Sequence, residues 1–416
     1  MKATVRVASL AMCLGLVIGA CSSSESTTAS ETATTSTAAN PALKPIDPAA
    51  FQAAVEKAAK DLYVPGAMVV LRTPQGEYRA AVGTTELGAQ RPPAGGTHFR
   101  IASNTKTLTA ALIVLLAQDG KLKFTDPVSN YLPDVPDGDK TTIADLLKMR
   151  SGLYNYTEAP ELAESLDSNP VKAWTPQEAL AIAFAQPREF APGAEYMYDN
   201  TNYVVLGVIA EKVGGRPLAE QFKQRLFGPV GISQTSLPAI DDTSIPAPYS
   251  HGYMYGESKY ALADIPYPSE MQAEMRSGAL KPIDYTYQNP SYATAAGGAI
   301  STADDLAKWI KALVSGKVFD SDYQQQWLDS LQIEDADSPG GQMYGYGISY
   351  QRYSPTAQMY YHGGELPGFN SFMGHDPEND VTLVIWTNLT LSPDGATTAN
   401  ALLPKVLNEV YTGMNY

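Results

Sequence analysis

The sequence predicts an α/β fold in which one sheet is built from both ends of the chain and a mostly helical region is inserted between them. Two short apolar runs near the start, 67–73 and 77–82, flank a Pro-Gln-Gly turn at 74–76 and indicate a strand hairpin. Later strand-like runs lie at 344–350, 358–361, 370–374 and 381–387. Because the middle of the chain carries helical patterns, the strands of the two ends are expected to meet in one sheet.

The helices are predicted from apolar spacing and from their end signals. The run 107–117 is apolar nearly all round and predicts a buried helix, with Gly120 as its C-terminal cap. Thr142 and Thr175 each begin a Thr-x-x-acid pattern that is typical of a capping box. The Tyr-, Pro- and Gly-rich stretch 245–290 is expected to be irregular, either as a cleft wall or lid or as a packed surface loop. Further helices are predicted at 49–62, 203–213, 302–313 and 400–411.

The first 21 residues form no part of the predicted fold. Lys2 and Arg6 give a charged start, and the apolar run 7–19 is too short for a comfortable membrane span. Small residues directly precede Cys21, which resembles a bacterial lipobox. We therefore predict a lipoprotein signal peptide over 1–21, with Cys21 lipidated and the protein anchored to the outer face of the bacterial cell membrane. An ordinary secretory signal with an incidental cysteine is the alternative.

The segment after Cys21 predicts a tether. Residues 22–39 are almost all Ser, Thr, Ala and Glu and include no large apolar residue that could support a core. We predict a disordered tether over 22–47 and one folded domain over 48–416. Its expected parts are an α/β part at about 48–130 and 286–416 and a helical insertion at about 131–285.

Composition excludes several classes of function. A chain of 416 residues with a net charge of −15 is not expected to bind nucleic acid, because phosphate binding needs a basic surface. The four histidines show no metal-ligand spacing and no phosphate-binding Gly-rich motif occurs, so neither a metal nor a cofactor is predicted. Cys13 would leave with the signal peptide, so the exported domain would hold no disulfide. We expect a monomer.

Ser103 is the only serine in the chain with a lysine, Lys106, three residues later. It lies where the run 99–102 gives way to a helical stretch. Residues three apart on a helix are neighbours, so the lysine amine can take the proton of the serine hydroxyl and activate it as a nucleophile. The Ser103 amide at a helix start suits a developing oxyanion. By itself the Ser-x-x-Lys pattern is weak, because it is common by chance.

Tyr198 and Asn200 are two residues apart on a predicted loop before a helix. Both side chains can point into one cleft, where the tyrosine can relay a proton to a leaving group and the Asn amide can hold a substrate amide. This pattern is weak by itself, since the chain has 25 tyrosines.

His362 begins a third segment, on a strand-like run that enters a turn at 366–368. The glycines that follow, including Gly364, let a backbone amide approach a substrate closely. The amide of Glu365 would be the second oxyanion donor beside that of Ser103. His362 could equally be a surface histidine with satisfied hydrogen bonds.

Together, the order, spacing and flanking residues of these segments resemble the serine penicillin-recognising enzymes. That group includes the low-molecular-weight D-alanyl-D-alanine carboxypeptidases, the class C β-lactamases and their esterase relatives. The likeness covers about 51–411 and is nearest to the actinobacterial soluble D-alanyl-D-alanine carboxypeptidase type. It implies a β-lactamase/transpeptidase-like fold, with an antiparallel sheet flanked by helices and an inserted mostly helical domain. Supporting segments are 99–102, 119–122, 151–153, 191–193, 202–203 and 296–298.

The resemblance also implies a function and roles for the site residues. The protein is expected to be an exported serine hydrolase that acts on D-Ala-D-Ala ends of cell-wall peptides. The alternatives are a β-lactamase or esterase of the same fold and a non-catalytic wall-binding lipoprotein, and the expected small-molecule partner is a peptide or a β-lactam. The implied roles are an acylated Ser103, the base Lys106, the acid/base Tyr198, Asn200 on the acyl side, His362 where relatives have lysine, and Gly364 and Glu365 beside the substrate.

Three positions depart from the family pattern. Asp199 stands where the family usually has Ser and would disfavour a Tyr198 phenolate unless its side chain points away. Gly363 stands where a Thr or Ser hydroxyl usually binds the terminal carboxylate of the substrate. Ser349 follows the Tyr-Gly-x-Gly pattern, where carboxypeptidase relatives tend to have arginine, and strand alternation puts Arg352 on the opposite face. Acyl transfer is therefore expected, while recognition of a free carboxylate is in question.

Overall fold

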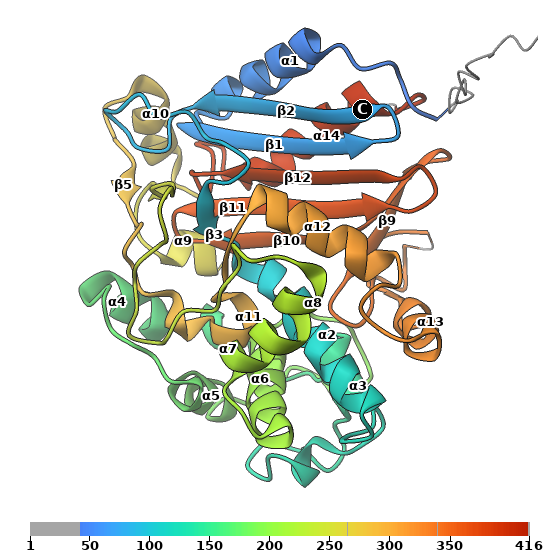
Figure 1. The fold of residues 1–416 in the computed structure, drawn as a ribbon. Helices are drawn as coiled ribbons and strands as arrows, with labels where there is room; N and C mark the ends of the chain where they lie inside the picture. Colours follow the sequence, from blue (N-terminus) through green and yellow to red (C-terminus); the bar gives the residue numbers. More distant parts are fainter. Residues whose placement is uncertain (1–41, 264, 339, 415–416) are drawn as a thin grey trace, which may run out of the picture. The chain divides into compact units, whose positions relative to one another are not determined.

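The computed structural model describes residues 42–263, 265–338 and 340–414. An eight-stranded antiparallel sheet has the order β2-β1-β12-β11-β10-β9-β8-β7, so strands from both ends of the chain lie side by side (Figure 1). The predicted sheet is thereby confirmed. Its strands are β1 (Gly66–Thr73), β2 (Gly76–Gly83), β7 (Gln332–Ile333), β8 (Met343–Tyr344), β9 (Ser349–Ser354), β10 (Ala357–Leu366), β11 (Phe369–Asp376) and β12 (Val381–Thr387).

The remaining strands form two short pairs, and helices are the other main regular elements of the described chain. The pairs are β3 (His98–Arg100) with β6 (Ile300–Thr302), and β4 (Tyr253–Met254) with β5 (Ile283–Asp284). The helices are α1 (Pro48–Asp61), α2 (Thr105–Gln118), α3 (Ile143–Leu147), α4 (Pro160–Ser168), α5 (Pro176–Phe184), α6 (Asn200–Gly214), α7 (Leu218–Phe222), α8 (Gly228–Val230), α9 (Lys259–Leu262), α10 (Ser269–Ser277), α11 (Thr294–Gly297), α12 (Ala303–Val314), α13 (Ser321–Asp329) and α14 (Thr398–Val410).

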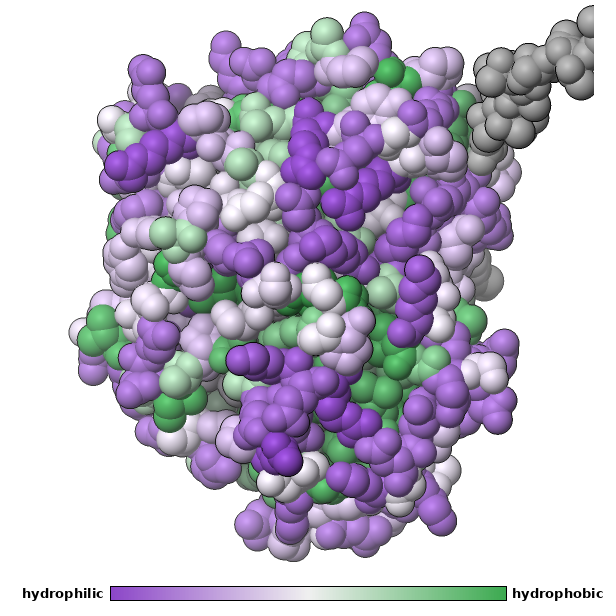
Figure 2. Space-filling model, viewed as in Figure 1, coloured by the Kyte–Doolittle hydropathy of each residue, from purple (hydrophilic) through white to green (hydrophobic). Residues whose placement is uncertain are grey.

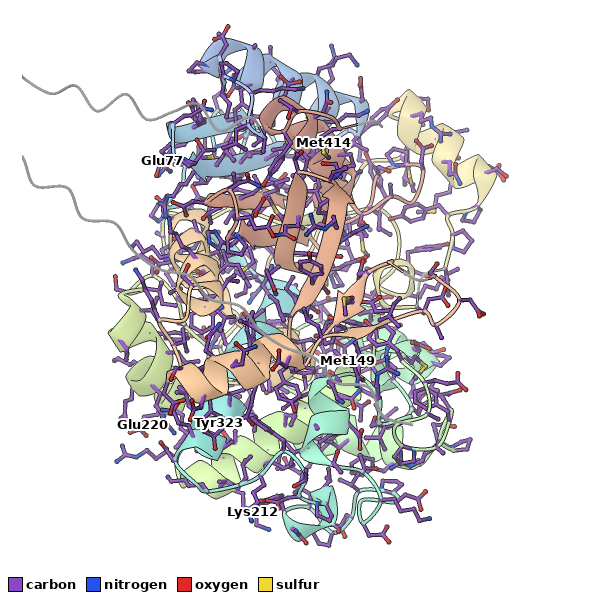
Figure 3. The ribbon with its side chains drawn as sticks, turned by 90° about the vertical axis from the view of Figure 1, so that its right-hand side faces the viewer. Glu77, Met149, Lys212, Glu220, Tyr323 and Met414 are labelled. Atoms are coloured by element: carbon purple, nitrogen blue, oxygen red, sulfur yellow. The ribbon has the colours of Figure 1, made fainter. Side chains whose placement is uncertain are left out.

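Both faces of the central strands are buried. Successive side chains of a strand point to opposite faces, so Val69 of β1 belongs to a core with α1 and α14, while Val70 belongs to the core that contains α2 and α12. This second core continues from the sheet into the helical region, which fills the lower half of Figure 1. In the side view of Figure 3, Glu77 and Met414 mark the sheet end and Lys212 and Glu220 the opposite, helical end.

Local sequence signals explain the helices that hold the site. All residues of α2 except Gln118 are buried, as its nearly continuous apolar pattern predicts. Both predicted capping boxes are present, with the hydroxyls of Thr142 and Thr175 accepting from backbone amides at the third helical position. Gly215 ends α6 in the left-handed conformation, which glycine adopts without a steric penalty.

Three predicted segments differ from the structure. The run 344–350 is not one strand, because a turn with Gly347 at φ +71° separates β8 from β9. The strand predicted at 358–361 continues to Leu366. Glycines at 363 and 364 have low strand propensity, but their backbone still pairs with β11. The stretch 245–290 is mostly irregular but contains the nine-residue helix α10.

The predicted tether overlaps the described fold at residues 42–47. Leu43 is buried and forms an isolated bridge with Tyr411, and the Lys44 amide donates to the Val410 carbonyl. This part of the chain is therefore packed on the domain. The predicted signal peptide 1–21, Cys21 and the tether up to residue 41 lie outside the described residues. No helix in the described part of the chain is long and apolar enough to cross a membrane.

Candidate active site

Ser103 lies in a single 3₁₀ turn, η1 (Ala102–Asn104), between β3 and α2. Ala102 has φ +50°, a conformation that costs roughly 1–3 kcal/mol in a residue with a side chain. The turn is held by Asn104, whose side-chain amide donates to the Ile101 carbonyl at 3.0 Å and to Ser371 Oγ of β11 at 2.8 Å. The Ser103 hydroxyl is thus presented from a strained, well-anchored backbone.

Lys106 lies in the first turn of the buried helix α2 and contacts Ser103. Its Nζ is 2.9 Å from Ser103 Oγ, 2.7 Å from Asn200 Oδ1 and 2.8 Å from the Ala296 carbonyl oxygen. Burial lowers the pKa of Lys106 well below its ordinary value, although the Asp199 carboxylate opposes this. A neutral amine has two N–H donors for Asn200 and Ala296, which leaves its lone pair to accept the Ser103 proton. The geometry therefore suits a general base.

Asn200 is the first residue of α6 and joins the helical region to Lys106. Its Nδ2 donates to Thr157 Oγ1 at 3.0 Å and its backbone amide donates to Asn155 Oδ1 at 3.2 Å. The preceding Asp199 caps the helix and accepts from the Thr201 amide at 2.7 Å. These contacts fix the amide oxygen of Asn200 toward the lysine.

Asp199 points into the helix start rather than toward Ser103. Its second carboxylate oxygen accepts from Asn202 Nδ2 at 3.0 Å, and the side chain is 1% exposed. Burial raises the pKa of Asp199 to about 7. Its charge nevertheless raises the pKa of Tyr198. The carboxylate that stands where the family usually has Ser therefore affects the tyrosine without pointing toward Ser103.

Tyr198 stands over the lysine with its ring centroid 4.9 Å from Lys106 Nζ. Although the residue as a whole is 37% exposed, desolvation of its hydroxyl raises the pKa of Tyr198, and an interaction with Ser103 partly offsets the rise. The tyrosine is therefore a neutral phenol near pH 7, which can donate a proton to a leaving group and recover one from Lys106.

His362 is buried on β10 and both of its ring nitrogens are used. Nδ1 lies 2.6 Å from the Gly363 carbonyl, which can only accept, so Nδ1 carries the hydrogen and Nε2 accepts from the Tyr344 hydroxyl at 3.1 Å. Burial is the main cause that lowers the pKa of His362 to about 3. The side chain that occupies the position of the family lysine is therefore uncharged.

Gly364 allows β10 to approach the nucleophile segment closely. A Cβ at Gly364 would lie 2.3 Å from the Ile101 carbonyl oxygen, so no other residue fits without moving the backbone. Strand β9 pairs with β10 only as far as Tyr361, and β10 continues past this point through Glu365 to Leu366. Residues 362–365 of this segment line the site beside Ser103.

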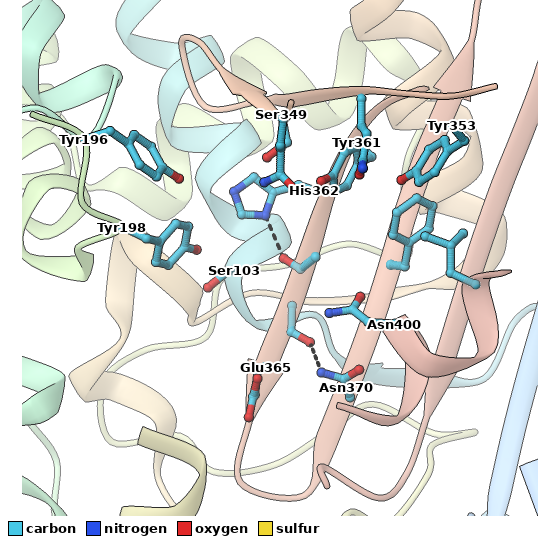
Figure 4. A pocket seen from close by; sticks show the side chains of 16 residues that line it. Ser103, Tyr196, Tyr198, Ser349, Tyr353, Tyr361, His362, Glu365, Asn370 and Asn400 are labelled. Carbon is cyan, nitrogen blue, oxygen red and sulfur yellow. Dashed lines mark hydrogen bonds between the residues drawn. The ribbon is translucent and has the colours of Figure 1, made fainter. Parts of the chain in front are cut away.

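Two pockets meet at Ser103, and we name them by their walls. The sheet-side pocket has a volume of about 430 Å³ and extends over β10 toward Tyr353 and Asn400 (Figure 4). The helix-side pocket has a volume of about 230 Å³ and is lined by Asn200 and Glu158, among others. Both pockets are also lined by Tyr198 and Glu365.

The structure brings the predicted site residues of the domain together, while Cys21 lies outside the described residues. Sequence reasoning missed several residues that shape the site, because they come from separate elements and belong to common residue types. These are Asn155, Thr157, Glu158, Tyr344, Phe372 and Asn400. Across residues 42–263, 265–338 and 340–414, no group of three or more His, Cys, Asp or Glu side chains could hold a metal ion.

Comparison with known protein families assigns this chain to one of them. The β-lactamase family model matches residues 51–407. The chain belongs to the β-lactamase family. A D-stereospecific amidohydrolase from Streptomyces sp. is 29% identical with a TM-score of 0.73, over 86% of this chain and 97% of that one. D-amino acid amidase from Ochrobactrum anthropi is 27% identical with a TM-score of 0.72, over 86% and 98% of the two chains.

A penicillin-binding protein of Bacillus subtilis is 27% identical over 75% of this chain, and the match spans 65% of that protein. Members of the β-lactamase family with this fold are serine hydrolases, and this protein is one of them. The β-lactamase/transpeptidase-like fold implied by the sequence resemblance is confirmed.

The departure from the family pattern at Ser349 lies on strand β9. Ser349 lines the sheet-side pocket, as do residues 351 and 353 on the same face of β9. Arg352 points to the other face, where it donates to Gln358 Oε1 at 2.6 Å. The prediction that Arg352 lies opposite Ser349 is confirmed.

Proposed function

We propose that this protein is an exported serine amidohydrolase that cleaves the amide bond on the carboxyl side of a D-amino acid residue, with D-aminoacyl amides as its preferred substrates. The observation that carries the chemistry is the contact of the buried Lys106 amine with Ser103 Oγ at 2.9 Å. The D-amino acid preference is supported by the names of the amidohydrolase and amidase relatives. D-Ala-D-Ala peptides are the substrate expected from the sequence. They too have a D-amino acid residue on the acyl side of the bond that is cleaved.

The proposed reaction begins at Ser103. Its O–H proton passes to Lys106 Nζ while Oγ bonds to the substrate carbonyl carbon. The carbonyl oxygen becomes an oxyanion between the amides of Ser103 and Glu365, and one such donor is typically worth about 3 kcal/mol. The C–N bond then breaks as Tyr198 protonates the leaving nitrogen and regains a proton from Lys106. Attack of water on the acyl-enzyme by the reverse proton path releases the acid.

The helix-side pocket suits the acyl half of a substrate with a free amino group. Glu158 and Glu365 line it beside Asn200, and none of its lining residues is Lys or Arg. Carboxylates attract an ammonium group, so the pocket charge supports D-aminoacyl amides more than N-blocked ones.

One comparison tests the proposal. The purified domain is offered a D-aminoacyl amide and its L-isomer, a D-Ala-D-Ala peptide, a chromogenic cephalosporin and a short-chain ester. We expect the D-amide to be turned over fastest and Ser103→Ala to abolish its turnover. Labelling with a fluorophosphonate and intact-mass measurement reports the nucleophile separately. A protein that hydrolyses the D-amide after Ser103→Ala, or that takes up no acylating probe, would refute the proposed chemistry.

An esterase of the same fold is the second candidate. The neutral His362 leaves the site without the cation that a free carboxylate would need, and esters carry no such carboxylate. A higher kcat/KM for the ester than for the D-amide in the same comparison would indicate an esterase. A β-lactamase would instead turn over the cephalosporin fastest.

We also propose that Cys21 carries a lipid that anchors a monomeric enzyme to the outer face of the cell membrane. This proposal rests on the small residues before Cys21. Cys21→Ser should move the protein from the membrane fraction to the soluble fraction, and an unchanged distribution would contradict the anchor.

A further inference from the structure

The sheet-side pocket has an aromatic and aliphatic far end. Tyr353 of β9, Phe372 of β11 and Leu403 of α14 line it beside Tyr361 of β10. The rings of Tyr361 and Phe372 stack with their centroids 5.2 Å apart. Figure 4 shows Tyr353 and Tyr361 side by side, on the far side of His362 from Tyr198. A group that entered this end would therefore contact ring faces and methyl groups.

Gly363 leaves open space on the way from Ser103 to this end. A Cβ at Gly363 would meet no atom nearer than 3.7 Å, and that atom is Oδ1 of Asn400. By the family resemblance, the residue at this position contacts the terminal group of the leaving half of the substrate. The missing side chain therefore widens the pocket on the leaving-group side, and Asn400 offers an uncharged amide there.

The charges around this pocket oppose a carboxylate. None of its lining residues is Lys or Arg, and the His362 ring hydrogen is used by the Gly363 carbonyl. Glu365 lines the pocket, and the Glu334 carboxylate lies near Tyr196 and Tyr361. A free carboxylate bound here would be desolvated without a cationic partner, which is strongly unfavourable.

We propose that the space over Gly363, with Tyr353, Phe372, Leu403 and Asn400, is a subsite for a bulky uncharged leaving group. This inference rests on the proposed acyl-enzyme function and specifies its substrate. The preferred leaving amine is one that carries an aromatic or branched side chain and ends in an amide, an ester or a continuing peptide. A terminal D-Ala with a free carboxylate is a poor leaving group in comparison.

Four substrates that share one D-aminoacyl group test this assignment. Their leaving groups are ammonia, D-Ala, D-Phe and D-Phe amide. We expect kcat/KM to be highest for D-Phe amide, about tenfold or more above D-Phe and above ammonia, as burial of an apolar group and avoidance of a buried charge predict. A higher kcat/KM for D-Phe than for D-Phe amide would overturn the inference.

Substitutions in the proposed subsite test whether its residues cause the leaving-group preference. Tyr353→Ala and Leu403→Ala should each lower the ratio of kcat/KM for D-Phe amide to that for ammonia by about tenfold. Tyr350→Ala, on the opposite face of β9, is the matched control and should leave this ratio unchanged. Gly363→Thr fills the open space and adds a hydroxyl, so it should shift the preference from D-Phe amide toward D-Ala. An unchanged ratio in Tyr353→Ala and Leu403→Ala overturns the inference.

Failure of this inference is distinguishable from failure of the proposed function. If the protein forms an acyl-enzyme on Ser103 and hydrolyses all four substrates equally, the proposed function stands and the subsite is wrong. If no substrate is hydrolysed and the fluorophosphonate labels no residue, the proposed function itself fails, and the subsite with it.

Discussion

The Lys106 amine contacts three oxygen atoms, which belong to the Ser103 hydroxyl, the Asn200 side chain and the Ala296 carbonyl. Burial favours its uncharged form, and only that form has a lone pair for the serine proton. Lys106→Arg places a permanently charged group at this position. We expect kcat/KM on a D-aminoacyl amide to fall at least about 100-fold, or about 3 kcal/mol in the barrier.

The control for this substitution is Lys308→Arg on the surface of α12, where Lys308 is 48% exposed and paired with Asp305. Its activity should match that of the wild type. Lys106→Arg activity within a factor of two of wild type would show that the lysine does not act as the base.

At the residue scale, the sequence predicted the groups with distinctive chemistry in a recognisable order, such as Ser103 followed by Lys106. It could not predict the contact of Tyr344 with His362, because the Tyr-Gly-x-Gly pattern that begins at this tyrosine does not indicate its hydrogen-bond partner. Asn400 was also unpredictable, since the space beside it depends on the absence of a side chain at Gly363 and on the docking of the last helix. Such pairs depend on tertiary packing rather than on spacing along the chain.

At the scale of the element, α6 begins at a buried carboxylate whose ionisation opposes folding. The pKa of Asp199 is about 7 in the folded protein and about 3.8 as the ordinary value, so the unfolded chain loses this proton first as the pH rises. Asp199 therefore lowers stability progressively between about pH 4 and pH 7, by up to about 4 kcal/mol, and no further above that range.

Asp199→Asn keeps a capping oxygen for the Thr201 amide and removes the ionisation. We expect the variant to gain thermal stability relative to the wild type as the pH is raised from 5 to 8. Melting temperatures of both proteins at several pH values check this. A melting-temperature difference that is constant over this range would mean that Asp199 does not titrate there.

The elements themselves were predictable where one signal dominated. The apolar run of α2 and the capping box at Thr175 gave correct helices. The boundary between β8 and β9 was missed because the turn at Gly347 lies in a segment whose tyrosines and isoleucine favour strand. The extension of β10 through Gly363 was missed because its pairing with β11 overrides the poor strand propensity of glycine.

At the scale of the whole molecule, one core links the sheet to the helical region. It contains Met68 and Trp386 of the sheet, α2, and side chains of the helical region such as Leu206. In Figure 2, apolar side chains on the visible face gather mostly in its lower half, over the helices, and polar side chains cover most of the rest. Since α2 also carries Lys106 and directly follows Ser103, the catalytic group depends on both parts being folded at once.

This continuity predicts that the sheet and the helical region unfold together. Leu112→Ala in α2 truncates a fully buried side chain of the shared core, which should cost about 2–5 kcal/mol. Calorimetry should then show one transition that moves to lower temperature as a unit. Leu87→Ala, at a residue that is 47% exposed, is the control and should leave the transition within about 0.5 kcal/mol of wild type. Two separate transitions in Leu112→Ala, one of them at the wild-type temperature, would mean that the helical region is an independently folding domain and that the site lies at a domain boundary.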